Sequence, residues 1–285
     1  MMNKLFHFGA LTVSVSGIVP PIPADSLLCP FLIDEGKADL QIIVFQDETF
    51  PIPDDAKEIY FSGIYRVRQK GGHIWAECCT RQGVTVWTYA VLHIDFSAPN
   101  KVRLQILQPN FKMTMDNLLS NVMMESLMLA HDRAIFHAAT IELNGSAILF
   151  TAPSGTGKST QAELWRKYRG AKIVNGDKIL LREENGTLLA CGLPYAGTSG
   201  ISQNQTLPVA AIVALQQGRE NVICSVPLTQ AVKLLTSQIC LQPWRAQDIL
   251  TALDMAQRIA SLVPIYHMAC LPDVSAVQCL QSVLK

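Results

Sequence analysis

The feature that most limits how this chain can fold is a glycine-rich turn at residues 152–159 (APSGTGKS), set between two regular segments. The apolar run at 147–151 predicts a buried strand, and the segment at 160–168 predicts a helix. A strand, a glycine-rich turn and a helix in this order bring consecutive backbone N–H groups to the helix N-terminus, where the helix dipole favours an anion. The sequence therefore predicts an α/β unit that binds phosphate groups at one edge of its sheet.

The glycine-rich turn fits a nucleotide-binding pattern at every position but the first, where Ala152 replaces a glycine. A Cβ there opposes a tight turn, but it affects neither the lysine nor the hydroxyl that follow. Lys158 is expected to place its ammonium on the β- and γ-phosphates of ATP, and Ser159 to bind Mg²⁺. An ordinary surface turn before a helix is the alternative. The predicted nucleotide-binding residues are Pro153, Ser154, Gly155, Thr156, Gly157, Lys158, Ser159 and Thr160.

Two further side chains are candidates for chemistry beside this turn. Asp177 follows the strand predicted at 171–174, and in a parallel sheet its carboxylate lies at the same edge as the glycine-rich turn. There it could bind Mg²⁺ or accept the proton of an attacking hydroxyl, whereas the alternative is a plain turn aspartate. His137 lies in an apolar segment expected to pair with the strand before the turn, as a catalytic neighbour or as a hydrogen-bonded core residue. The turn at 197–200 (GTSG) offers hydroxyls where a substrate could dock, although ordinary loop chemistry explains it equally well.

The region before residue 133 shows a different pattern, rich in β-strands separated by proline and glycine turns. The succession of strands and turns predicts an antiparallel meander, followed by one helix at 114–134 with Asp116 as a candidate cap. The methionines of that helix are expected to lie in the core. The strands are predicted at 11–18, 40–45, 59–69, 74–80, 84–95 and 101–107.

Strands alternate with helices after residue 133, which is typical of an α/β domain. Asn-Gly pairs at 144–145 and 185–186 predict two tight hairpins. The domain division is therefore expected near residue 133, with a β-rich region at 1–133 for acceptor or partner binding and a catalytic domain at 134–285. Further strands are predicted at 135–143, 179–182, 188–193, 208–216 and 264–269, and further helices at 228–239, 246–262 and 273–284.

Composition excludes several classes of partner. The chain has 23 Lys and Arg residues and 23 Asp and Glu residues, and it has no run of basic residues. We therefore expect it to bind neither nucleic acid nor an anionic membrane. No apolar run reaches the roughly 20 residues that span a bilayer. The eight cysteines lack CxxC spacing, which indicates reduced thiols. Polar residues interrupt the apolar segment at 5–19, which argues against a secretory signal peptide. The sequence favours a cytoplasmic protein, and a homo-oligomer stays possible.

Together these residues resemble the catalytic domain of HPr kinase/phosphorylase, a P-loop fold shared with ATP-dependent phosphoenolpyruvate carboxykinase. The shared order is Phe-His-Ala at 136–138, an Asn-Gly hairpin, the glycine-rich turn, and Asp177, within residues 134–285. The resemblance implies an α/β P-loop kinase core of this type, preceded by a β-rich N-terminal region. It assigns Asp177 as the base for a seryl hydroxyl and His137 as a residue acting on the acceptor. The family has Asp-Asp where this chain has Gly176-Asp177. Asp177 is therefore expected either to bind the metal and act as the base, or to keep only one of these two roles.

The expected function is an ATP- and Mg²⁺-dependent kinase that transfers the γ-phosphoryl group to a hydroxyl. A similarity to HPr kinase-like proteins of peptide-modification systems implies that the acceptor is a serine of a peptide or small protein. The predicted catalytic residues are Asp177, His137 and Lys158, and the predicted metal ligands are Ser159 and Asp177. Two alternatives stay open: a small-molecule kinase, and a nucleotide-binding regulatory module without turnover.

Overall fold

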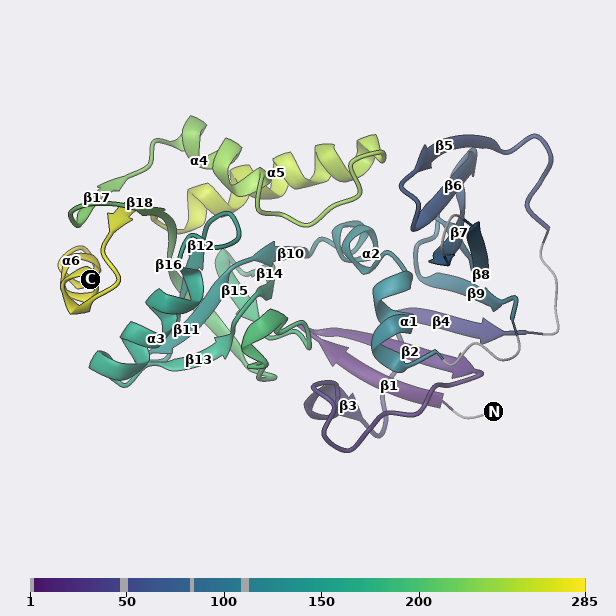
Figure 1. Cartoon of the computed structure of the whole chain (residues 1–285), viewed down its shortest axis with the longest axis horizontal. Coiled ribbons are helices and arrows are strands. Elements are labelled where there is room, and N and C mark those ends of the chain that lie inside the picture. Colours follow the sequence, from purple (N-terminus) through teal and green to yellow (C-terminus); the bar gives the residue numbers. More distant parts are fainter. Residues whose placement is uncertain (1–2, 47–50, 83–84, 109–112, 285) are drawn as a thin grey trace. The chain divides into compact units, whose positions relative to one another are not determined.

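The chain forms two compact units, Met1–Ala130 and His131–Lys285. The computed structural model describes residues 3–46, 51–82, 85–108 and 113–284 (Figure 1). Within these ranges each unit contains a nine-stranded sheet. The protein is thus a mixed α/β chain with large sheets and few helices. The division between the units falls beside the boundary expected near residue 133.

The sheet of the first unit is mixed, so the predicted antiparallel meander is wrong in its first half. β2 pairs parallel with β4, and β4 pairs parallel with β9. Parallel neighbours require long connections, and here the chain makes excursions between β2 and β4 and between β4 and β9. The order is β3-β1-β2-β4-β9-β8-β7-β6-β5. The strands are β1 (Asn3–Phe8), β2 (Leu11–Gly17), β3 (Leu32–Ile33), β4 (Leu40–Phe45), β5 (Lys57–Phe61), β6 (Tyr65–Lys70), β7 (His73–Gln82), β8 (Thr85–Asp95) and β9 (Lys101–Ile106).

Several predicted strands of this unit differ from the structure in their bounds. The strand expected at 59–69 is a hairpin of β5 and β6, with Gly63 in a left-handed conformation (φ 79°) between them. The strand expected at 84–95 begins at Thr85, and its predicted first residue lies outside the described ranges. The β-strand β1 lies before the first strand that the sequence predicts.

The helix predicted at 114–134 is two helices, α1 (Met115–Asn121) and α2 (Met124–Ala130). Met123 between them has a left-handed backbone (φ 54°), which a continuous α-helix does not allow. The cap is Thr114 and not Asp116, because the Thr114 side chain accepts a hydrogen bond from the Asn117 N–H at 3.2 Å. The helix methionines are buried, as the sequence predicts.

The sheet of the second unit brings four strand ends to one edge. β12, β16 and β18 run parallel to one another. β13 runs in the same direction, because β13 and β12 each pair antiparallel with β11, which lies between them. β16 also pairs antiparallel with β15, and so continues the sheet to β14 and β10. The strands are β10 (Ala134–His137), β11 (Ala139–Leu143), β12 (Ser146–Thr151), β13 (Lys172–Asn175), β14 (Lys178–Glu184), β15 (Thr187–Cys191), β16 (Thr206–Gln217), β17 (Val222–Ser225) and β18 (Ile265–Cys270).

Both predicted Asn-Gly hairpins are confirmed. Asn144 and Gly145 join β11 to β12 with φ angles of 51° and 80°. Asn185 and Gly186 join β14 to β15 with angles of 51° and 75°. Left-handed backbone at both positions is the type I′ turn, whose twist matches that of the flanking strands.

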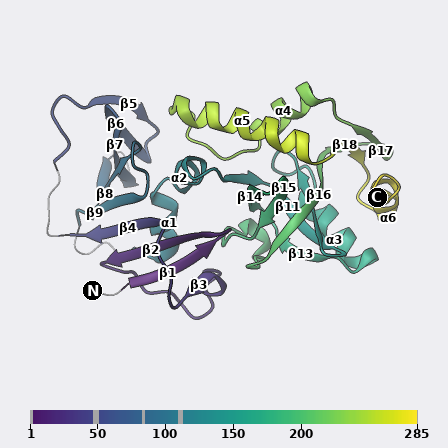
Figure 2. The ribbon, with the colours of Figure 1, turned by 180° about the vertical axis from the view of Figure 1, so that it is seen from behind.

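Four helices accompany this sheet: α3 (Lys158–Arg169), α4 (Leu228–Thr236), α5 (Ala246–Leu262) and α6 (Val274–Gln281). α3 packs with α6, whereas α4 packs with α5, which contacts β15. Figure 2 shows α4 and α5 together along one side of the unit, away from α3. No helix in the described ranges has the length and apolar character needed to cross a membrane.

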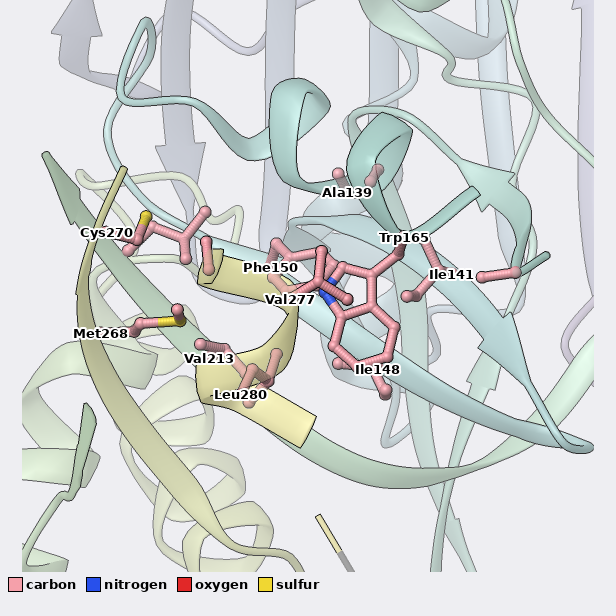
Figure 3. Packing of buried hydrophobic residues seen from close by; sticks show 14 of the residues in the cluster. Ala139, Ile141, Ile148, Phe150, Trp165, Val213, Met268, Cys270, Val277 and Leu280 are labelled. Carbon is pink, nitrogen blue, oxygen red and sulfur yellow. The ribbon is translucent and has the colours of Figure 1, made fainter. Parts of the chain in front are cut away.

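Trp165 of α3 is the largest fully buried side chain and fixes this helix against the sheet. Its indole lies beside Ile148 and Phe150 of β12 and Val277 of α6 (Figure 3). Because α3 directly follows the glycine-rich turn, this packing also sets where the turn leaves the sheet.

We expect Trp165→Ala to destabilise the protein by about 3–5 kcal/mol, since the cavity left by an aromatic side chain adds to the lost burial. Urea unfolding of the full chain measures this change. Tyr168→Ala on the same helix is the control, because Tyr168 is 41% exposed. Equal stability of Trp165→Ala and the control would contradict the anchoring role.

Candidate functional site

The glycine-rich turn connects β12 to α3, as the sequence predicts, and its conformation depends on two glycines. Gly155 and Gly157 have left-handed φ angles of 78° and 117°, which strain any residue with a side chain. A Cβ at either position would meet nothing within 4 Å, so open space lies beside both. Ala152, by contrast, is buried and is not among the residues with positive φ. The alanine is therefore compatible with this turn.

Lys158, the first residue of α3, folds back onto the glycine-rich turn. Its Nζ donates to the Ala152 carbonyl at 2.8 Å and to the Pro153 carbonyl at 3.4 Å. Burial lowers the pKa of Lys158, and the carboxylate of Asp177 opposes that shift. The ammonium is thus held at the turn and lies within the electrostatic reach of Asp177.

The structure gathers most of the predicted site residues around one cavity of about 380 Å³, here called the catalytic cavity. All three predicted catalytic residues line it. Of the predicted nucleotide-binding residues, Pro153 and Thr156 are not in its lining, although the Pro153 carbonyl accepts from the Thr156 N–H at 3.4 Å. The lining is His137, Ser154, Gly155, Gly157, Lys158, Ser159, Thr160, Gly176, Asp177 and Thr198.

His137 and Asp177 form a hydrogen-bonded pair in this cavity, with 3.2 Å between Nε2 and Oδ1. Burial lowers the pKa of His137, and Lys158 lowers it further, whereas Asp177 raises it. Burial and Lys158 together therefore favour the neutral form of the imidazole. A carboxylate can only accept a hydrogen bond, so the ring hydrogen lies on His137 Nε2, which donates the hydrogen bond to Asp177 Oδ1. Both side chains are about one-third exposed, at 30% and 31%, and can be reached from the cavity.

Asp177 is positioned by Asn175, whose role the sequence analysis missed. Asn175 is fully buried, and its Oδ1 accepts from the backbone N–H groups of Asp177 at 2.8 Å and Lys178 at 2.9 Å. Its Nδ2 donates to the Leu193 carbonyl at 2.8 Å. Asparagine commonly bonds the backbone two residues onward, so the sequence Asn-Gly-Asp carried a signal for this turn.

The position of His137 corrects one sequence prediction. The strand expected at 135–143 is two strands, so His137 ends β10, which pairs with β14, and not the strand that forms the hairpin with β12. The strand partner changes at Ala138: β10 pairs with β14 up to His137, β11 pairs with β12 from Ala139, and the Ala138 N–H still donates to the Asp177 carbonyl at 2.9 Å. This bond ties the backbones of the two catalytic candidates together.

Two residues outside the predicted set, Thr151 and Gln238, also hold the backbone of His137. The Thr151 hydroxyl lies 2.8 Å from the His137 carbonyl and 2.9 Å from Gln238 Oε1, and its single hydrogen is shared between these two acceptors. The His137 N–H donates to the Gln238 carbonyl at 2.9 Å. Because Gln238 is about 90 residues from Thr151 in sequence, only the folded chain brings them together.

The turn predicted at 197–200 lies against Asp177, as the 3₁₀-helix Gly197–Ser199. A Cβ at Gly197 would lie 2.9 Å from the Asp177 carboxyl carbon, and one at Gly176 would lie 1.9 Å from the Ser199 hydroxyl. This close approach favours glycine at 176, because any side chain there would meet Ser199. Asp177 is left as the carboxylate of the catalytic cavity.

The donor set fits Mg²⁺ bound together with a nucleotide. No group of three or more His, Cys, Asp or Glu side chains within the described ranges could hold a metal by itself. Mg²⁺ is typically bound by one or two protein ligands plus phosphates and waters. Ser159 and Asp177 line the same cavity and could provide such ligands beside phosphates on the glycine-rich turn.

The opposing influences on His137 give a testable pair of shifts. Asp177→Asn is expected to lower the pKa of His137 further, because Asp177 raises it, and Lys158→Ala is expected to raise it. An NMR titration of the His137 ring protons in both variants measures these directions. Lys167→Ala, at an exposed position on α3 outside the cavity lining, is the control and should leave the titration unchanged. If the titration is the same in all three variants, these groups do not share one cavity in solution.

Comparisons with known proteins place the chain in a family. The solved structure of the Hpr(Ser) kinase/phosphatase from Coxiella burnetii matches with a TM-score of 0.33 and 14% identity, over 52% of this chain and 93% of that chain. No curated protein matches the sequence. A family model matches residues 105–272, more than half of the chain, including the glycine-rich turn, His137 and Asp177. The chain therefore belongs to the family described as SynChlorMet cassette protein ScmC.

Proposed function

We propose that this chain is an ATP- and Mg²⁺-dependent kinase that transfers the γ-phosphoryl group to a hydroxyl. The observation that supports the proposal best is the placement of the His137–Asp177 pair in one cavity with Lys158 and Ser159. A structural aspartate in a plain turn would not need a histidine partner and a lysine ammonium beside it. We further propose that the second unit has a P-loop kinase core of the HPr kinase type.

Each residue of the catalytic cavity has a distinct role in this proposal. Bound Mg²⁺·ATP supplies the γ-phosphoryl group and part of the charge neutralisation. The Asp177 carboxylate accepts the proton of the acceptor hydroxyl while that oxygen bonds to the γ-phosphorus and the bond to ADP breaks. His137 Nε2–H orients the carboxylate, and Lys158 stabilises the negative charge on the transferred group. Ser159 provides a hydroxyl to the metal.

We propose a serine of a peptide or small protein as the acceptor, and the cytoplasm as the compartment. The order of Phe136-His137-Ala138, the glycine-rich turn and Asp177 supports the first part, because it matches that of kinases acting on seryl hydroxyls. All eight cysteines lie in described ranges and none forms a disulfide, which supports a reducing compartment.

The test is incubation of the full chain with γ-labelled ATP, Mg²⁺ and a library of serine-containing peptides. The expected result is a gain of one phosphoryl group on a peptide, located by mass spectrometry. Label found only on small hydroxyl compounds would replace the proposed acceptor with a metabolite. Nucleotide binding without transfer or ATP hydrolysis would show a regulatory module instead.

We propose that the first unit recognises the acceptor, since every residue lining the catalytic cavity belongs to the second unit. A truncated protein beginning at His131 keeps the ion pair of Asp132 with Arg258 and is expected to bind nucleotide while losing peptide phosphorylation. Nucleotide affinity and acceptor kinetics, compared with the full chain, measure both properties. Equal acceptor kinetics in the two proteins would refute this division of roles.

A further inference from the structure

The turn at 197–200 carries a hydroxyl that the proposed mechanism does not use. Thr198 lies in the 3₁₀-helix Gly197–Ser199, between Gly197 and Gly200, whose φ angles of 54° and 64° are both left-handed. Such angles strain any residue with a side chain, so a glycine on each side lets the chain turn sharply around Thr198. Thr198 itself is exposed and lines the catalytic cavity.

Of the two hydroxyls in this turn, that of Thr198 is the one available for a reaction. The Ser199 hydroxyl donates to the Ala196 carbonyl at 2.6 Å and accepts from the Ile201 N–H at 3.2 Å. Ser199 is also not in the lining of the catalytic cavity. The Thr198 hydroxyl, by contrast, has no hydrogen-bond partner among the residues that the structure describes. Ser199 therefore supports the turn, and Thr198 presents a free hydroxyl to the cavity.

The lining of the catalytic cavity comes from two parts of the second unit. One part is the glycine-rich turn with the start of α3, where the phosphates are proposed to lie. The other part contains His137, Asp177 and Thr198, from the ends of β10 and β13 and from the turn at 197–200. In phosphoryl transfer the attacking and leaving oxygens lie roughly in line on opposite sides of the phosphorus. With ADP leaving on the side of the glycine-rich turn, the attacking hydroxyl comes from the side of Asp177 and Thr198.

Thr198 belongs to a turn that approaches the proposed base closely. A Cβ at Gly197 would lie 2.8 Å from the Asp177 Cβ and 3.3 Å from Asp177 Oδ1, so the backbone next to Thr198 packs against this side chain. The Thr198 hydroxyl is therefore tethered near the base. Tethering a reactant replaces an encounter in solution by an intramolecular step, which accelerates the reaction. Threonine also carries the same functional group, an alcohol, as the proposed seryl acceptor.

We propose that Thr198 is a self-phosphorylation site, to which the chain transfers the γ-phosphoryl group of its own bound ATP. This inference rests on the proposed function, because it uses the same nucleotide and the same base. Thr198 Oγ1 bonds to the γ-phosphorus, the bond to ADP breaks, and the proton of the hydroxyl passes to Asp177. The new phosphate carries about two negative charges beside the Asp177 carboxylate and fills the acceptor side of the cavity. The phosphorylated chain is therefore blocked for transfer to a peptide.

The test is incubation of the phosphatase-treated full chain with γ-labelled ATP and Mg²⁺ in the absence of peptide. The expected result is a gain of one phosphoryl group, located at Thr198 by mass spectrometry. The labelled fraction should grow at the same rate after the protein is diluted, because the step is intramolecular. Thr198→Val should lose the label, whereas Thr198→Ser keeps an alcohol and should retain it. Thr187→Val is the matched control and should label like the wild type, because Thr187 is exposed at the start of β15 and outside the cavity lining.

A second measurement uses the wild-type chain and the peptide that it phosphorylates. Protein preincubated with Mg²⁺·ATP should transfer to this peptide more slowly than protein preincubated with Mg²⁺·ADP, and phosphatase treatment should restore the rate. Equal rates would overturn the block of the acceptor side.

The remaining outcomes separate this inference from the proposed function. If a peptide is phosphorylated but Thr198 is not, this inference is overturned while the proposed function stands. If neither is phosphorylated, the proposed function fails and this inference fails with it. Label at another hydroxyl of the cavity, such as that of Ser154, also overturns it, and so does a labelling rate that falls when the protein is diluted.

Discussion

Lys158→Ala is expected to lower phosphoryl transfer by about 10³-fold or more while the protein stays folded. The Lys158 ammonium lies at the glycine-rich turn and lines the catalytic cavity, where it would neutralise charge on the transferred group. Removing such a preorganised charge acts mainly on the transition state. The measurement is the initial rate of transfer from γ-labelled ATP at saturating Mg²⁺, with circular dichroism to check the fold.

Lys167→Ala provides the matched control for this prediction. Lys167 is exposed on the last turn of the same helix, where its ammonium lies over the Tyr168 ring. Its removal changes the net charge by the same amount but does not alter the catalytic cavity, so the rate should stay at the wild-type value. Unchanged transfer in Lys158→Ala would exclude the glycine-rich turn as the phosphate site.

Asp177→Asn is the second large expected effect, because it tests the residue on which a kinase and a simple nucleotide binder differ. Asparagine keeps the shape of the side chain but cannot accept the proton of the acceptor hydroxyl. We expect transfer to fall by about 10²- to 10⁴-fold with little change in nucleotide affinity. Rates and nucleotide dissociation constants across a Mg²⁺ titration measure both quantities.

The same titration separates the two roles that Asp177 could have. If Asp177 mainly binds Mg²⁺, the variant should bind Mg²⁺·ATP more weakly, and raised Mg²⁺ should restore part of the rate. Asp254→Asn is the control, since Asp254 lies on the exposed side of α5 and outside the lining of the catalytic cavity. Wild-type rates and affinities in Asp177→Asn would show that Asp177 is only a turn residue.

The sequence predicted the elements around the catalytic cavity well because their signals are local. Two Asn-Gly pairs predicted the hairpins, and the order of apolar strand, glycine-rich turn and helix predicted the connection from β12 to α3. Each depends on backbone preferences of a few neighbouring residues. Local chemistry therefore placed Lys158 and Asp177 correctly at one sheet edge.

The features that the sequence did not predict depend on contacts between residues that are distant in the sequence. One apolar run is divided into β10 and β11 because it pairs first with β14 and then with β12, and nothing in the run itself marks this change of partner. Met123 adopts a left-handed conformation that separates α1 from α2, although the helical spacing of apolar residues continues through it. Parallel pairing of β2, β4 and β9 is likewise set by the sheet as a whole.

The close approach of Ser199 to Gly176 also limits how this site can change by mutation. An aspartate introduced at 176 would place its Cβ 2.5 Å from the Ser199 Cβ, so even Ser199→Ala would not make room for it. Positions 176 and 199 are therefore coupled, because Ser199→Gly removes the two closest contacts that a Cβ at 176 would make. A library of single substitutions would classify position 176 as restricted to glycine, whereas the double variant Gly176→Asp with Ser199→Gly offers a route to a two-carboxylate site.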